Sequence, residues 1–436
     1  MEGNSTPATT TAPAKTQQTN SAYSPGHKRK SQGKVLMEIT AMSGEYPADF
    51  IPRMIPAASY ARKIISTLVG DKLIKPVLAG GLKGYRLTPK GKRQLLSDNP
   101  ARFAGFLDGA VETNKIRKGY ERRLRLHSLA EVCTLMHNAE VEIFKDVKPR
   151  VYLPDAPTVS SQPHDKSPEG GKPPKVNNHS PSENPSQPSV AHEGVNPGQR
   201  SPPIISAPCF YTSREQKGQE DNAIRGSRAA GTLLTPEHIY AIYNTGSAVS
   251  GWSKNTEQRF KAEVEANISR KLLVSQYEGR AVGGIMIGKD LGTLEKYLAV
   301  DEKDKNVYDF LIKVYQPFYY VTNDIHGEAQ LKLLCDRDKM AMLRNAMLQR
   351  NLPPDKSCPV ENDAITADGK PVLFCCHLDF PRLIRFRNSA ILHKKAGKVA
   401  AFDFQVDMLK NYLKDTAEIV NLNFNNIMAR LYQENR

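Results

Sequence analysis

The sequence is poor in cysteine and lacks long apolar runs. Its six cysteines among 436 residues are too few and too scattered for a disulfide framework, which indicates a reducing compartment. No stretch approaches the roughly 20 apolar residues that a membrane-spanning helix needs. The Thr/Ala/Gln-rich tract that follows Met1 has no apolar segment and does not resemble a signal peptide. We therefore expect a cytoplasmic protein that does not engage a membrane.

Motifs of several enzyme classes are also missing. The chain has no Gly-x-x-x-x-Gly-Lys-Ser/Thr phosphate loop and no His-x-His pair of the kind that common relaxases use to bind metal. The Gly-Ser-Arg at residues 226–228 lacks the second glycine of a nucleophile elbow. Cys375 and Cys376 have no second Cys-x-x-Cys pair to complete a zinc site, and adjacent strand residues face opposite sides. We interpret both as buried structural cysteines.

A restriction-like nuclease site is the remaining catalytic candidate. Such sites hold a metal with an Asp on one strand and an Asp/Glu-x-Lys on the next. The obvious match, Asp301-Glu302-Lys303, lies in the charged run Asp301–Lys305, which reads as a loop. A three-residue pattern of this kind arises by chance in most chains of this length. We assign no catalytic residue, no metal ligand and no cofactor, and favour a protein that is not an enzyme.

Acidic residues are scarce in the first third of the chain. The whole sequence has 61 Lys+Arg and 46 Asp+Glu, a net charge of +15. Residues 1–150 hold 25 Lys+Arg and 13 Asp+Glu, whereas the remaining 286 residues hold 36 and 33. Most of the positive charge therefore lies in one part of the protein. Such a concentration attracts polyanions by releasing their counterions.

This basic part has the pattern of a winged helix. Three short helical patterns, at residues 35–42, 48–55 and 59–73, precede two apolar-alternating runs at 75–78 and 84–87. The glycine-containing segment 79–83 between the runs indicates a hairpin. Thr88 can cap a following helix that has Pro89 at its first position. In winged helices of this order, the third helix enters the major groove of DNA.

The third helical pattern has an apolar and a polar side. Ile64, Ile65, Leu68 and Leu73 recur at helical spacing and should face the core. The outer side chains are of the types that contact base edges and phosphates, and we assign groove contacts to Tyr60, Arg62, Lys63, Ser66 and Thr67. Phosphate contacts are assigned to the cations of the wing and the next helix, Lys83, Arg86, Lys90, Lys92 and Arg93. The alternative is that these cations form only a solvated face.

Composition divides the chain into four parts. Residues 1–33 are a polar tail that we expect to be disordered. Residues 34–150 form the winged-helix domain, which ends in a long helical pattern over Arg117–Phe144. Residues 151–208 contain 13 prolines in 58 residues and are predicted to be a disordered Pro/Ser-rich linker. Residues 209–436 alternate strands and helices and form a mixed α/β or α+β domain.

Two features of the chain have two interpretations each. The helix over Arg117–Phe144 either packs back on the winged helix or forms a dimer seam. In the C-terminal domain, a strand pair at 228–234 and 238–244 ends in a polar turn, Asn244-Thr245-Gly246, that we place at a cleft. Trp252 is either a core anchor, which we favour, or a stacking surface for a base.

Further along the C-terminal domain, several elements follow from apolar patterns. The expected strands and helices include a helix over 331–348, strands over 372–377 and 383–387, and a largely helical segment over 404–431.

The N-terminal third resembles a known family. Leu87–Gly91 (Leu-Thr-Pro-Lys-Gly) is followed by an Arg-rich segment leading into Leu126–Val132 (Leu-His-Ser-Leu-Ala-Glu-Val). This pattern is similar to the replication-relaxation family of bacterial plasmids and integrative conjugative elements, over about residues 34–145. The resemblance implies a role in element replication, DNA relaxation or their control through the winged helix. Some members of this family carry a nuclease-like C-terminal domain.

We therefore predict a double-stranded DNA-binding protein of a mobile genetic element that acts in, or regulates, replication or transfer. A homodimer and replication or transfer proteins are its candidate partners. Two alternatives stay open. One is a metal-dependent nuclease with a restriction-like C-terminal domain. The other is a non-catalytic adaptor that recruits replication or transfer proteins.

Overall fold

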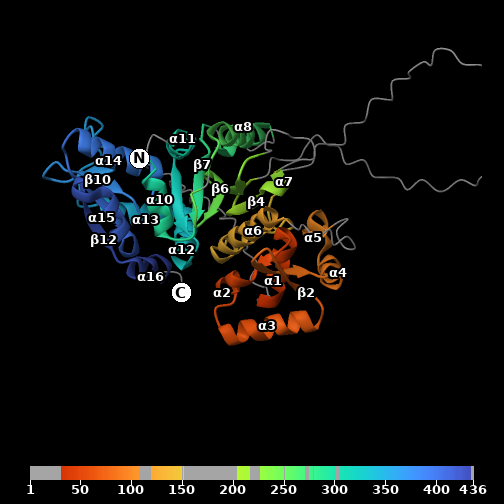
Figure 1. Ribbon diagram of the computed structural model, residues 1–436. Coiled ribbons are helices and arrows are strands. Elements are labelled where there is room, and N and C mark those ends of the chain that lie inside the picture. The colour runs from red at the N-terminus through yellow and green to blue at the C-terminus, as the bar shows by residue number, and fades with distance from the viewer. Residues whose placement is uncertain are drawn as a thin grey trace, which may run out of the picture.

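The computed structural model describes residues 31–107, 119–149, 151, 204–216, 226–249, 251–270, 274–277, 279–300 and 304–433. These residues form an N-terminal group of small elements and two larger sheets with helices around them (Figure 1). No helix in the described ranges combines the length and the apolar character that crossing a membrane demands.

The N-terminal group is mostly helical and contains one small sheet. Its helices are α1 (Gln32–Ser43), α2 (Ile51–Met54), α3 (Ala58–Gly70), α4 (Pro89–Asp98), α5 (Pro100–Leu107) and α6 (Tyr120–Asn138). Its antiparallel strands, in the order β1-β3-β2, are β1 (Tyr46–Pro47), β2 (Ile74–Ala79) and β3 (Leu82–Leu87). The predicted hairpin and the helices on either side of it are therefore present.

Local sequence signals set the boundaries of these elements. Ser31 accepts a hydrogen bond from the Lys34 N–H at 3.3 Å and caps α1. Thr88 accepts from the Gly91 N–H at 3.1 Å and caps α4, as the sequence predicts. The β2–β3 turn uses two glycines with positive φ, Gly80 at 59° and Gly81 at 77°.

A five-stranded sheet follows in the order β4-β5-β6-β7-β8. Its strands are β4 (Cys209–Thr212), β5 (Ala229–Leu234), β6 (Ile239–Gly246), β7 (Gly283–Gly288) and β8 (Phe318–Thr322). The first three are antiparallel and the last three are parallel. Parallel neighbours need crossover connections. The helices between these strands are α7 (Ser213–Gln216), α8 (Lys254–Arg270), α9 (Val274–Tyr277), α10 (Leu291–Leu298) and α11 (Lys305–Lys313).

The second sheet has the order β12-β11-β10-β9. Its strands are β9 (Ala364–Ile365), β10 (Pro371–Phe374), β11 (Gly397–Phe402) and β12 (Ala417–Leu422). The helices of this part are α12 (Ile325–Leu334), α13 (Arg337–Leu348), α14 (Phe380–Leu392), α15 (Val406–Leu413) and α16 (Phe424–Gln433). An isolated antiparallel bridge pairs Tyr319 of β8 with Asp379, which lies between β10 and α14. The C-terminal part is thus mixed α/β, as predicted.

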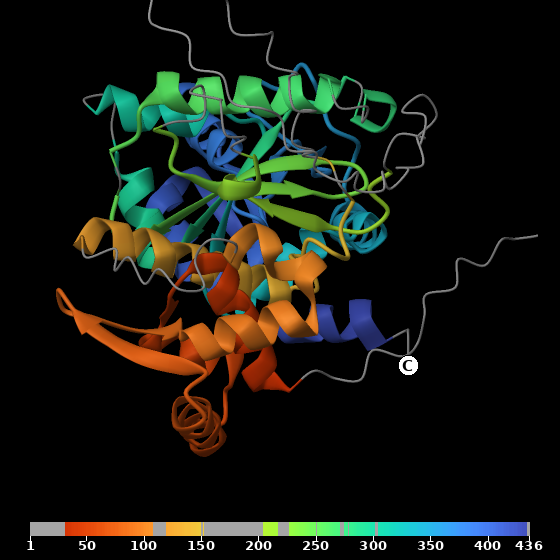
Figure 2. The ribbon, with the colours of Figure 1, turned by 90° about the vertical axis from the view of Figure 1, so that its right-hand side faces the viewer.

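Helix α6 lies between the rest of the N-terminal group and the five-stranded sheet (Figure 2). It packs on α1 and β1 on one side and on β5, β6 and α12 on the other. Alternate strand residues such as Ile242 and Ile285 therefore enter the same hydrophobic cluster as Leu36 and Met136. The opposite sheet face packs on helices including α8, α11 and α14. The predicted boundary at residue 150 consequently does not separate two hydrophobic cores.

Polar contacts cross the same junction. The carboxylate of Glu131 in α6 accepts hydrogen bonds from Asn244 at 2.9 Å and from Asn323 at 3.2 Å. Burial raises the pKa of Glu131. Glu328 at the start of α12 binds Arg53 of α2 and accepts from Asn138 at 2.7 Å. The polar turn at Asn244 thus faces α6, and α6 packs back rather than presenting an open apolar seam.

The ends of the predicted linker are part of the folded core. Val151 and Ile205 are buried in the cluster on the far face of the sheet, and the Glu142 N–H donates to Pro208 at 2.9 Å. Residues 152–203 of the linker and 1–30 of the tail lie outside the described residues.

Three secondary-structure predictions were wrong. Residues 383–387 belong to α14, because Phe380, Leu383 and Ala390 bury at helical spacing behind a Pro at the helix start. The helix predicted over 331–348 is two helices, because Asp336 caps α13 by accepting from the Lys339 N–H. The segment 404–431 contains the edge strand β12, which pairs in parallel with β11.

Candidate nucleic-acid interface

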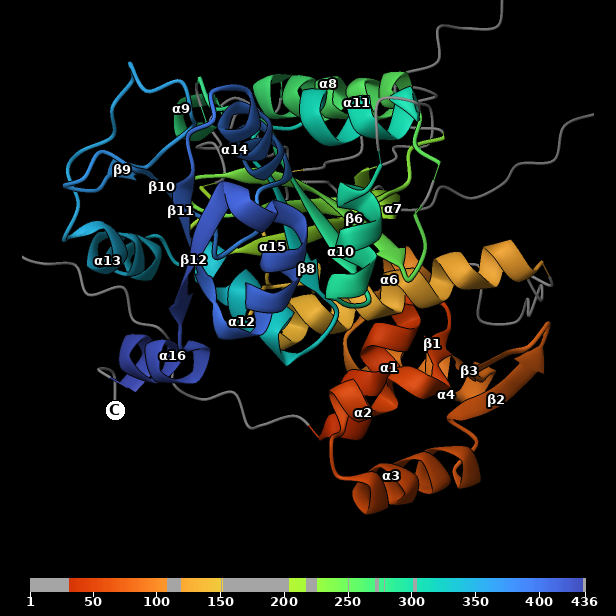
Figure 3. The same ribbon diagram turned by 60° about the vertical axis from the view of Figure 1, so that its left-hand side comes forward.

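Helix α3 stands at one extreme of the molecule, away from both large sheets (Figure 3). Only Ala61 and Leu68 of this helix are buried, while Ile64 and Ile65 are half-buried against the core. The helix packs on α1 where a glycine allows close approach. A Cβ at Gly33 would lie 3.2 Å from Ile64. The predicted inner side of this helix is therefore the side that packs.

The outer side of α3 carries the predicted groove contacts. All five are exposed: Tyr60, Arg62, Lys63, Ser66 and Thr67. The helix contains no acidic residue. Within the described ranges, Arg62 and Lys63 make no ion pair and no side-chain hydrogen bond, so both cations are available to a ligand. The tyrosine ring of Tyr60 is 48% exposed, which is unusual for a large aromatic side chain.

The hairpin β2–β3 lies beside α3 and presents one of its two predicted cations. Lys83 is exposed. Arg86 is instead turned toward the protein, where its guanidinium binds Glu45 at 2.7 Å. Leu78 near the tip is 71% exposed. The sequence does not reveal the pairing of Arg86, because its partner is 41 residues away.

Glu45 holds the hairpin against α6. Its carboxylate is fully buried and contacts Arg86, Arg123 and His127, the last at 2.8 Å. Burial opposes ionisation, but hydrogen bonds from these three side chains outweigh it and lower the Glu45 pKa to about 2. Arg123 also donates to the carbonyl oxygens of Val77 and Ala79 in β2. The wing-like hairpin is therefore fixed to a helix of the shared core.

Helix α4 contributes the remaining predicted cations. Arg93 is exposed, and Lys90 donates to the carbonyl oxygen of Asp71 at 3.0 Å. Lys92 is half-buried, and its pKa is lowered by desolvation and by the nearby Lys75. Of these, Arg93 presents its charge most openly to solvent.

The segment from α2 to α4 is strongly basic. Residues 51–98 contain ten Lys+Arg and two Asp+Glu. In the described ranges, six of these cations form no ion pair or side-chain hydrogen bond: Arg62, Lys63, Lys72, Lys75, Lys83 and Arg93. Positive charge that has no partner inside the protein is the electrostatic signature of a surface for polyanions.

The catalytic candidate that the sequence offers in the C-terminal part is not among the residues that the structure describes. Residues 301–303, with Asp301 and Lys303, lie outside the described residues. Strands β5 and β6 carry no acidic side chain, so this strand pair offers no carboxylates for a metal. No cluster of three metal-ligating side chains occurs in the described ranges. Cys375 and Cys376 are buried, as predicted, and burial raises their pKa values.

Trp252 and the polar residues near it form core structure. Trp252 is 3% exposed and stacks on Phe310 with ring centroids 4.6 Å apart, which supports the core-anchor interpretation. Glu257, also buried, accepts from Ser227 at 2.7 Å and from Tyr243 at 2.9 Å. The hydrogen bonds of these groups are therefore made within the core.

No family model, no curated protein and no solved structure matches this chain significantly.

Proposed function

We propose that the protein binds double-stranded DNA through a winged helix formed by residues 32–107. Helix α3 would enter the major groove, the β2–β3 hairpin would be the wing, and α4 would lie along the phosphate backbone. The observation that carries this proposal is the outer face of α3. It combines two unpaired cations, a tyrosine and two hydroxyls, faces solvent along its length and contains no acid.

Each side chain of the interface has a role suited to its chemistry. Arg62 and Lys63 supply donors for guanine O6 and N7 or for phosphate oxygens. Tyr60, Ser66 and Thr67 add shorter-range hydrogen bonds and, for the tyrosine, apolar contact with bases or sugars. Lys83 and Arg93, both exposed, would contact phosphates. Arg86 acts on this interface indirectly, by holding the hairpin through Glu45.

The wider role extends this proposal. We propose that DNA binding serves replication or transfer of a mobile element, as the resemblance of residues 34–145 suggests, with replication or transfer proteins as partners of the C-terminal part. A homodimer on two half-sites stays a prediction. The buried position of α6 means that such a dimer would use another surface.

The test is fluorescence anisotropy of the full chain on labelled duplex DNA from around its own gene and on a scrambled duplex, across a salt series. The full chain is used because the N-terminal group shares its core with the sheet. We expect Arg62→Ala/Lys63→Ala to weaken binding about tenfold or more and to flatten the salt dependence.

The matched control removes two exposed cations elsewhere. Lys289 and Lys410 are exposed and lie in the C-terminal part. Lys289→Ala/Lys410→Ala changes the net charge equally, so it should bind DNA almost as the unchanged protein does. Equal affinities of the two double variants would contradict the assignment of α3 as the DNA-contacting helix.

A further inference from the structure

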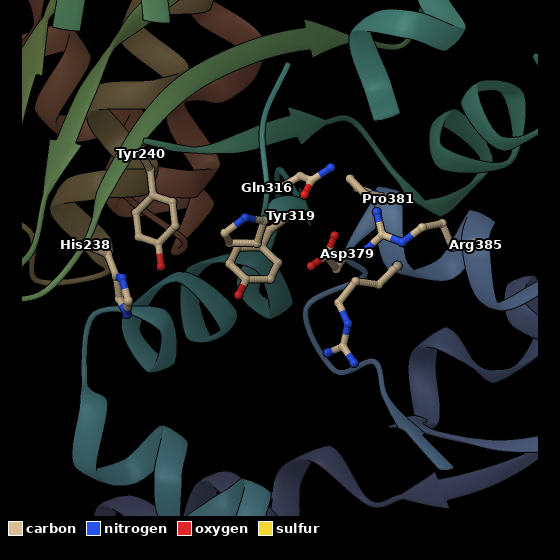
Figure 4. A pocket seen from close by; sticks show the side chains of 9 residues that line it. His238, Tyr240, Gln316, Tyr319, Asp379, Pro381 and Arg385 are labelled. Atoms are coloured by element: carbon tan, nitrogen blue, oxygen red, sulfur yellow. The ribbon is translucent and has the colours of Figure 1, made fainter. Parts of the chain in front are cut away.

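A pocket of about 310 Å³ lies at the junction of the two large sheets, away from α3. Figure 4 shows His238, Tyr240 and Tyr319 on one side of it and Asp379 and Arg385 on the other. His238 lies in the turn between β5 and β6, Tyr240 in β6 and Tyr319 in β8. Asp379 directly precedes α14, whose first turns carry Arg385. This volume is in the range of small-molecule sites.

Several polar groups of the pocket have no partner. Asp379 is 8% exposed, and its Oδ1 is buried without a hydrogen bond. The hydroxyls of Tyr240 and Tyr319, which unlike Asp379 Oδ1 are not fully buried, make no hydrogen bond among the described residues. A buried carboxylate oxygen without a partner is costly, and native structures leave few of them. Their convergence on one cavity indicates a ligand with complementary groups.

Three rings, with neighbouring planes tilted by 49° and 52°, line one side of the pocket. The rings of Tyr240 and Tyr319 have centroids 6.0 Å apart, and His238 lies 5.9 Å from Tyr240. A planar heterocycle can contact such rings and exclude water from them.

Two guanidinium groups are held at the pocket by acidic side chains. Glu361 accepts from Nε of both Arg382 and Arg385 at 2.7 Å and from Nη2 of Arg385 at 3.2 Å, and Asp363 pairs with Nη2 of Arg382 at 3.0 Å. The Nη1 group of each arginine makes no hydrogen bond within the described part of the chain. Arginines positioned in this way keep donors for a phosphate without first having to be ordered.

We propose that this pocket binds a nucleotide. The base contacts Tyr240 and Tyr319 and donates its exocyclic amino group to Asp379, in the way that carboxylates accept from cytosine. The phosphate takes the remaining donors of Arg382 and Arg385. The nucleotide is either a free nucleotide or a nucleotide of a single DNA strand. This site is separate from α3, and its occupation does not depend on the proposed duplex binding.

Isothermal titration calorimetry of the full chain with dAMP, dCMP and dTMP tests the free nucleotide. Fluorescence anisotropy with a labelled short oligodeoxyadenylate tests the strand. Arg385→Gln should weaken nucleotide binding about tenfold or more. Lys394→Gln, which removes an exposed charge just beyond the same helix, should not. Asp379→Asn should weaken dAMP and dCMP, whose bases carry an amino group, more than dTMP, whose base carries none.

Thermal unfolding of each variant checks that it folds. If Asp379→Asn does not fold, Arg385→Gln alone tests the proposal. Binding of the free nucleotides, lost in Arg385→Gln, supports the proposal. Binding of the oligonucleotide alone, with the same loss, supports it and identifies a DNA strand as the source. No binding of any of these probes, or unchanged affinity in Arg385→Gln, overturns it.

Discussion

Glu45 is the residue on which the arrangement of the N-terminal group depends most. It is fully buried, yet it is ionised because three side chains surround its carboxylate. Two of them, Arg123 and His127, come from α6, and the third, Arg86, comes from β3. A buried ion pair adds little stability compared with apolar packing, but removing one partner leaves an uncompensated charge. The stability of the protein should therefore be sensitive to substitution of any residue in this cluster.

We expect Glu45→Gln to lower the free energy of unfolding by about 3 kcal/mol, because Arg123, only 1% exposed, loses its counter-charge. Urea denaturation measures this change. The matched control is Asp98→Asn, which breaks the exposed pair with Lys34 and should cost less than about 1 kcal/mol. Similar losses in the two variants would contradict the proposed importance of burial.

The same residue predicts a pH dependence. The Glu45 pKa falls from 4.5 to about 2 in the folded protein, so its contribution to stability is full above pH 4.5 and disappears as the pH falls toward 2. Between pH 5 and pH 3, the unchanged protein should therefore lose more stability than Glu45→Gln does. Equal losses over this interval would show that Glu45 does not carry the acid sensitivity.

At the level of elements, patterns between residues close in sequence predicted the structure correctly, whereas contacts between residues far apart in sequence were not predicted. The hairpin, the Thr88 cap and the outward side of α3 depend on residues a few positions apart, and all lie where the sequence places them. The strand predicted at 383–387 failed because a five-residue alternation fits either a strand or one side of a helix. Strand β12 was not predicted because its pairing with β11 depends on tertiary structure.

The candidate site was predictable to a similar degree. Helical spacing identified Arg62 and Lys63 as outward-facing. It did not reveal that Arg86 points inward, nor that the nucleotide pocket assembles from segments as distant as His238 and Asp379. Such contacts depend on the topology of the sheets, which periodicity does not encode.

Close packing of α4 gives a second stability prediction. A Cβ on Gly91 would collide with the carbonyl oxygen of Leu73, whereas a Cβ on Gly70 would meet nothing within 4 Å. We expect Gly91→Ala to lower the free energy of unfolding by about 2 kcal/mol, because overpacking outweighs the gain in helix propensity. Gly70→Ala, the control, should be neutral or stabilising. Thermal or urea denaturation measures both changes. An unchanged free energy of unfolding in Gly91→Ala would contradict this packing.

For the whole molecule, the decisive feature is the core shared by the N-terminal group and the five-stranded sheet. Apolar side chains from α1, α6, β6 and β7 belong to one cluster. Charge and proline content divide the chain at residue 150, but composition cannot reveal that α6 packs on both sides. The two halves are thus expected to unfold in one cooperative step.

A fragment that ends at residue 149 tests this organisation. Without the sheet, the side of α6 that contacts β5 and β6 becomes solvent-exposed. We expect the fragment to bind a hydrophobic dye and to self-associate, in contrast to the full chain. Dye fluorescence and analytical ultracentrifugation measure both properties. A monomeric fragment that does not bind the dye and unfolds cooperatively would show that the N-terminal group is independent after all.

The attachment of the hairpin to α6, and of α6 to the sheet, has a consequence for how the protein sits on DNA. If α3 occupies the major groove, the C-terminal part is carried at a fixed azimuth around the duplex axis. Two copies on neighbouring sites would then face the same way only when the sites are separated by whole turns of about 10.5 base pairs. The spacing between two binding sites would therefore determine which surfaces of the two copies face each other.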